Sequence, residues 1–134
     1  MWESYDLGNE DFLWACIPFM GGISSWQQAP CGAVSASAVS LALRHRCDLR
    51  DKEEAREARK TIRRLSGEVV RRFTEEFGSI TCLDLVETDF SKPGEYKRFR
   101  ESGVWKDKCN NYVGFIIETL YEFEQEGETE MPGG

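Results

Sequence analysis

Apolar side chains recur at helical intervals through most of this 134-residue chain. The clearest run lies within 52–77, where they step by threes and fours along one face: Ala55, Ala58, Ile62, Leu65, Val69, Phe73 and Phe77. This spacing is typical of an amphipathic helix, and Asp51, directly before it, is a favoured capping residue. Glutamates alternate with the basic residues at pairing distances, so we expect the polar side to be a solvated, ion-paired face.

Shorter helical patterns occupy much of the remaining chain. We expect helices over 7–19 and 31–44, a single helical turn or short helix over 81–86 capped by Ser79 or Thr81, and another around Tyr96, Phe99 and Arg100. A last helix is expected to begin near Asp107 and to bury one side: Cys109, Val113, Ile116, Ile117, Leu120 and Phe123. No segment alternates as a strand does. The pattern predicts an all-α fold, a single-domain bundle of about four to six helices over 7–123, with 124–134 as an acidic, disordered tail.

Composition narrows the classes of partner. The net charge of −7 repels nucleic acid and anionic membranes, so neither is expected as a partner. The N-terminal residues lack the basic start and apolar run of a signal peptide, and no apolar run reaches the roughly 20 residues of a membrane span. We therefore expect a cytoplasmic protein.

Three of the five cysteines stand where helices are expected to start. Cys31 follows Pro30, Cys82 follows a capping Thr, and Cys109 lies two residues after the expected cap Asp107. Backbone N–H groups and the helix dipole at such positions favour a thiolate, which lowers the thiol pKa and prepares sulfur for nucleophilic attack or metal ligation. The sequence predicts that Cys31, Cys82 and Cys109 form a joint catalytic or metal-binding site, assembled by folding.

The other candidates have plainer interpretations. Cys16 lies inside a helix pattern among large apolar residues, where it is expected to pack. Cys47 lies in a polar, exposed context after the helix 31–44. His45, the single histidine, is flanked by arginines, which indicates a helix end facing water rather than a catalytic base. The small residues of 31–44 indicate close helix packing or, alternatively, room for a ligand or cluster.

The segments 19–23 and 30–36 together resemble a redox-active protein family named for its pattern of Cys, Cys-Gly-Ala-x-x-Gly, Cys and Cys. The order of the later motifs agrees, because Phe73, Phe77, Gly78, Ser79 and Cys82 follow, and then Cys109. The resemblance covers about 7–123. It implies a redox role beside transport or oxidoreductase systems, without naming a substrate.

The chain departs from that family pattern in two ways. Ala36 stands where the motif has its second glycine. The first family cysteine would lie in a helix upstream of Met1, and the spacing of Cys16 from Cys31 does not match it. The chain is therefore expected to be either a shortened member with three site cysteines or a sequence without the upstream helix.

Three functions stay open from the sequence. The first is thiol–disulfide or electron-transfer chemistry with an unidentified redox partner protein. The second is a metal-binding module, with zinc or an iron–sulfur cluster held by the same three thiolates. The third is a non-catalytic helical interaction or assembly protein, for which a homodimer is one form. Whether the chain is an enzyme is not decided by these patterns.

Overall fold

The computed structural model describes residues 9–130, with side chains described through Gly127. The described chain contains six α-helices and one short 3₁₀-helix: α1 (Asp11–Cys16), η2 (Ile17–Phe19), α2 (Gly32–Arg44), α3 (Lys52–Phe77), α4 (Cys82–Val86), α5 (Glu95–Ser102) and α6 (Val104–Glu130). Two isolated β-bridges occur among these residues and no longer strand. The all-α prediction is confirmed.

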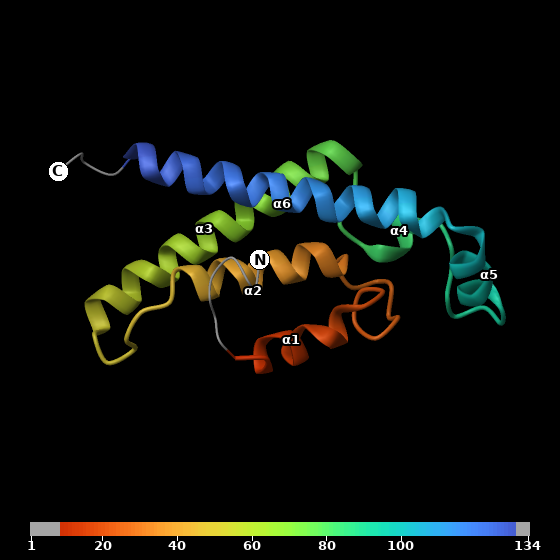
Figure 1. Ribbon diagram of the computed structural model, residues 1–134, viewed down its shortest axis with the longest axis horizontal. Coiled ribbons are helices and arrows are strands. Elements are labelled where there is room, and N and C mark those ends of the chain that lie inside the picture. The colour runs from red at the N-terminus through yellow and green to blue at the C-terminus, as the bar shows by residue number, and fades with distance from the viewer. Residues whose placement is uncertain (1–8, 131–134) are drawn as a thin grey trace.

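The long helices α2, α3 and α6 form the body of the molecule, and each contacts the other two (Figure 1). Helix α1 lies beside α2, while α4 and α5 gather at one end, next to the start of α2 and the start of α6 (Figure 1). A main core fills the space between the long helices: Val34, Leu41, Leu65, Val69, Phe73, Leu85, Tyr112, Ile116, Leu120 and Phe123. A smaller cluster of Cys82, Val86 and Phe99 lies at the end with α4 and α5.

Helix α3 has the bounds and the cap that its sequence predicts. The Asp51 side chain accepts a hydrogen bond from the backbone N–H of Glu54 at 3.0 Å, which satisfies one of the unpaired donors of the first turn. Its exposed face carries ion pairs within the helix, and Arg72 also reaches Glu122 and Glu126 on α6. The ion-paired face is confirmed, and Arg72 adds a link to α6.

The first and last helices differ from their predicted bounds. Helix α1 begins at Asp11, and the expected residues 7 and 8 lie outside the described part. Helix α6 begins at Val104, directly after Gly103, and continues to Glu130. The disordered tail expected from residue 124 is therefore wrong for 124–130, where Glu124 and Glu126 pair with arginines of α2 and α3. Residues 131–134 lie outside the described part.

Not all of the predicted core side of α6 is buried. Val113 and Ile117 are half exposed, and they line a groove of about 450 Å³ with Leu13 and Cys16 of α1 and small residues of α2. Buried Tyr112 takes the place expected for Val113, because α6 meets α3 and α4 through that side. No helix in the described residues has the length and apolar character to cross a membrane.

Candidate functional site

A backbone bridge brings the first two candidate cysteines together. Pro30 and Thr81 form an isolated antiparallel bridge. On either side of it, the Cys31 N–H donates to the Ile80 carbonyl at 2.6 Å and the Cys82 N–H donates to the Ala29 carbonyl at 3.2 Å. Cys31 and Cys82 are thus diagonal neighbours on the same face of the bridged segments.

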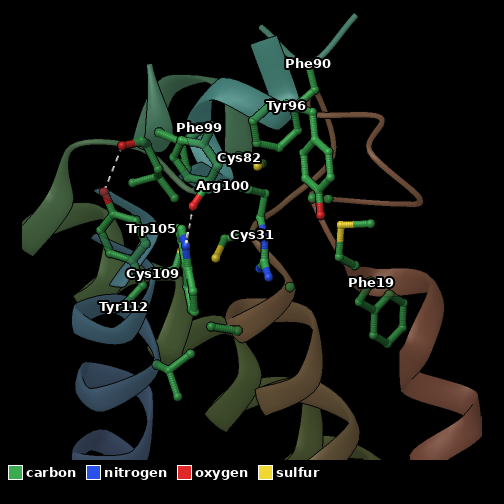
Figure 2. A pocket seen from close by; sticks show the side chains of 18 residues that line it. Phe19, Cys31, Cys82, Phe90, Tyr96, Phe99, Arg100, Trp105, Cys109 and Tyr112 are labelled. Carbon is green, nitrogen blue, oxygen red and sulfur yellow. Dashed lines mark hydrogen bonds between the residues drawn. The ribbon is translucent and has the colours of Figure 1, made fainter. Parts of the chain in front are cut away.

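The third candidate cysteine faces the same cavity from α6. Cys31, Cys82 and Cys109 all line a pocket of about 240 Å³ at the end of the bundle that carries α4 and α5 (Figure 2). Its walls are largely aromatic, with Phe19, Phe90, Tyr96, Phe99, Trp105 and Tyr112 among them. The chain therefore gathers into one cavity three thiols that lie far apart in the sequence.

Helix starts account for two of these three positions. Cys31 occupies the N-cap position of α2, and Cys82 is the first residue of α4. Cys109 does not lie at a helix start, because α6 begins at Val104 and Cys109 lies in its second turn. Asp107 resembled a cap in the sequence, but Gly103, with its positive φ of 74°, ends α5 and lets α6 begin at the next residue.

Burial changes the expected electrostatics of the thiols. It raises the pKa of Cys31, and the nearby backbone N–H groups of Ala33 and Val34 oppose that rise only in part. Burial also raises the pKa of Cys82 and of Cys109, and the charge of the Cys31 thiolate adds to both. The predicted lowering of the pKa is therefore wrong in direction, since desolvation outweighs the helix start.

Sequence reasoning missed Gln27, which fixes the loop around Cys82. The buried Gln27 amide donates to the Thr88 carbonyl at 2.8 Å and accepts from the Phe90 N–H at 2.7 Å. Its Nε2 also lies 3.7 Å from Cys82 Sγ, a weak hydrogen bond that opposes the rise in the pKa of this thiol. Its partners lie about sixty residues away in the sequence, so no local pattern marks the residue.

A close backbone contact explains the glycine after the first site cysteine. A Cβ atom on Gly32 would lie 2.4 Å from the Phe19 carbonyl oxygen, far closer than real Cβ contacts. The absence of a side chain lets α2 begin directly against η2. This contact positions Cys31 beside the aromatic wall that contains Phe19.

The remaining sequence candidates lie outside the pocket. Cys16 lines the groove along α1, in agreement with a packing role. Cys47 is half-buried rather than exposed, and its pKa is raised by desolvation and then by Glu54. His45 ends α2, about 20 Å along that helix from Cys31, so it cannot act as base for the pocket thiols.

The expected role of His45 as a charged, water-facing helix end is also wrong. Its Nε2 is buried without a hydrogen-bond partner in the described structure. The pKa of His45 is lowered by this burial and then by the charges of Arg44 and Arg64. At neutral pH the imidazole is therefore largely uncharged.

The geometry of the three thiols differs from that of a metal centre. Within the part of the chain whose side chains are described, no group of three or more His, Cys, Asp or Glu residues is arranged to hold a metal ion. Cys31, Cys82 and Cys109 share a cavity without forming such a ligand set. The residues thus do not fit the zinc or iron–sulfur site expected as an alternative, and no chemical step below passes through one.

Comparison with known protein families gives a match over most of the chain. The family described as "Putative redox-active protein (C_GCAxxG_C_C)" matches residues 1–123. No curated protein and no solved structure matched the chain. The family match spans all three pocket cysteines, and the chain belongs to this family of redox-active proteins.

Proposed function

We propose that this protein carries out thiol–disulfide exchange in the aromatic pocket, with Cys31 as the nucleophile and Cys82 as the thiol that completes the internal disulfide. The observation that carries the proposal is that Cys31, Cys82 and Cys109 line one cavity. Cys31 is proposed as the nucleophile because it occupies the N-cap position of α2, where the backbone N–H groups of Ala33 and Val34 oppose the rise in its pKa.

The proposed oxidation balances with a small disulfide as the oxidant. The Cys31 thiolate attacks one sulfur of the disulfide, the S–S bond breaks, and one thiolate leaves while a mixed disulfide forms on Cys31. The Cys82 thiolate then attacks the Cys31 sulfur and releases the second thiolate. Two electrons pass from the cysteines to the small disulfide, and the two thiol protons go to water or to the leaving thiolates.

The bridge that places Cys31 and Cys82 on the same face favours them as the pair that forms the internal disulfide. Their Cα atoms must come within about 4.4–6.8 Å of each other for the bond to close. Cys109 lies in the same cavity and is the alternative second thiol.

The proposal is tested by mapping the bonds that a mild oxidant produces. The reduced protein is treated with hydroxyethyl disulfide, quenched with acid, and digested without reduction for mass spectrometry. We expect one internal disulfide that joins Cys31 to Cys82, or to Cys109 in the Cys82→Ser variant. The matched controls are Cys16→Ser and Cys47→Ser, which remove thiols outside the pocket and leave the bond unchanged.

Two results would contradict the proposal. Formation of an internal disulfide at the normal rate in Cys31→Ser would show that another thiol is the nucleophile. Failure of the wild-type protein to form any internal bond, together with unchanged cellular effect of a triple Cys→Ala variant, would leave the non-catalytic helical scaffold as the better explanation.

A further inference from the structure

The cysteine pocket contains a single charged residue. Among the described residues that line it, Arg100 alone carries a charge, and all the others are apolar, aromatic, glycine or cysteine. Figure 2 shows its side chain pointing into the cavity that holds the Cys31 sulfur. A cation in an otherwise apolar cavity is a recognition feature, because such sites use a few placed polar groups to orient a ligand.

The position of Arg100 is fixed by Trp105. The guanidinium lies 4.6 Å from the centre of the Trp105 ring system, a cation–π distance, and the Trp105 indole N–H donates to the Arg100 carbonyl at 3.1 Å. Stacking of this kind holds the planar guanidinium and leaves its N–H donors directed outward. The residue is thus oriented without a carboxylate.

No carboxylate among the described side chains pairs with Arg100. The neighbouring acidic groups are engaged elsewhere: Glu95 with Arg98, Glu101 with Lys97, and Glu87 with Lys108. An unpaired guanidinium beside a low-dielectric cavity is suited to an anion supplied by a ligand. The positive charge of Arg100 is opposite in sign to the net charge of the chain, which is −7. Any attraction for an anion therefore comes from the pocket and not from the protein as a whole.

The size of the cavity limits the kind of anion. Its volume of about 240 Å³ lies below the roughly 300–1,000 Å³ of pockets for drug-sized ligands. A compact molecule fits, with its disulfide at the sulfur of Cys31 and its charged end at the rim where Arg100 is exposed. A planar, forked donor such as guanidinium matches the two oxygens of a carboxylate, the smaller of the anions that it binds through two hydrogen bonds.

We propose that the substrate class of the pocket is a small disulfide that bears a carboxylate, and that Arg100 binds this carboxylate while Cys31 attacks the sulfur. The inference rests on the proposed thiol–disulfide function. The exchange step is the balanced one given above, with the carboxylate-bearing disulfide as the two-electron oxidant. Arg100 is a specificity residue, since it touches the substrate and not the breaking bond.

Three disulfides of similar size and different charge test the inference. They are dithiodiglycolate, which is anionic, hydroxyethyl disulfide, which is neutral, and cystamine, which is cationic. The rate of internal disulfide formation is measured for the wild type and for Arg100→Gln by acid quenching and mass spectrometry. The ratio of the two rates for each reagent cancels the intrinsic reactivity of that reagent.

We expect Arg100→Gln to lower the rate with dithiodiglycolate about tenfold, as for the loss of one charge-assisted hydrogen bond at a half-open site. The rate with hydroxyethyl disulfide should stay unchanged and the rate with cystamine should rise. Arg100→Lys should retain part of the anion preference, because it keeps the charge and loses the planar fork. Arg98→Gln on the same helix is the matched control, since Arg98 pairs with Glu95 outside the pocket.

The outcomes separate this inference from the function on which it rests. Equal rate ratios for the three reagents would overturn the role of Arg100 while leaving thiol–disulfide exchange intact. An equal loss of anion preference in Arg98→Gln would show a general surface-charge effect and would also overturn it. Absence of an internal disulfide with every reagent would contradict the proposed function itself.

Discussion

Replacement of Gly32 by alanine tests how the chain positions Cys31. The new Cβ atom would lie 2.4 Å from the Phe19 carbonyl oxygen and 3.2 Å from its carbonyl carbon. Both atoms belong to the backbone and cannot rotate away, so η2 and α2 must separate by about 0.6 Å to reach even 3.0 Å. Overpacking of this kind costs about 1–3 kcal/mol, which exceeds the gain in helix propensity at a first-turn position. We expect a net destabilisation of about 1–2 kcal/mol.

The matched control is Gly67→Ala in the middle of α3. A Cβ atom at Gly67 has nothing within 4 Å, so the change should raise stability by about 0.5–1 kcal/mol through helix propensity alone. Urea denaturation of the reduced proteins, analysed with the same dependence of the unfolding free energy on urea concentration, gives the change in stability for both variants. Displacement of Phe19 should also change the alkylation rate of Cys31 in Gly32→Ala and not in Gly67→Ala.

An unchanged or increased stability of Gly32→Ala would refute this reasoning. If Gly32→Ala unfolds at the same or a higher urea concentration than the wild type, the contact with Phe19 does not determine the glycine. If stability falls while Cys31 keeps its alkylation rate, the contact supports the fold without positioning the thiol.

The contacts of three other residues, Cys31, Gln27 and Asp51, lead to further predictions of reactivity and stability. Because burial raises the pKa of Cys31, its alkylation rate should still be rising above about pH 9, where that of a cysteine in an unstructured peptide, with the ordinary pKa of about 8.5, is levelling off. The folded protein holds this proton more tightly than the unfolded chain, so the stability of the reduced form should fall as pH rises above about 8.5, as measured by urea denaturation. Gln27→Leu leaves the partly buried Phe90 N–H and Thr88 carbonyl without their side-chain partner and should lower the free energy of unfolding by about 1–3 kcal/mol, whereas Gln28→Leu at the exposed neighbour should be nearly neutral. Asp51→Ala removes the cap of α3 and should lower stability by about 1 kcal/mol, with Asp51→Asn close to the wild type.

Local signals account for the parts of the structure that the sequence predicts well. Asp51 and the spacing of Leu65, Val69 and Phe73 define α3 without help from distant residues. The motif around Cys31 and the turn before Cys82 likewise mark the starts of α2 and α4. These features depend on neighbours a few positions away, which is the range over which periodicity and capping act.

Long-range packing accounts for the features of the structure that the sequence does not predict. The pKa of Cys31 depends on how deeply folding buries it, and no helix-start rule contains that information. Gln27 and Arg100 acquire their roles only when the loop before α2 and helix α5 meet the cysteines. The last helix extends beyond its predicted end at both sides. At its C-terminal side, Glu126 pairs with Arg72 of α3, a contact between residues far apart in the sequence.

The bridge between Pro30 and Thr81 has a consequence for the strength of the whole bundle. A covalent bond between Cys31 and Cys82 would close a ring that contains all of α2 and α3. In the chain-entropy account, a ring of this length stabilises the fold by about 4 kcal/mol. The oxidised protein would then unfold at a higher temperature than the reduced protein. By thermodynamic linkage, folding would stabilise the disulfide to the same extent, so the dithiol would be a stronger electron donor in the folded protein than in the unfolded chain.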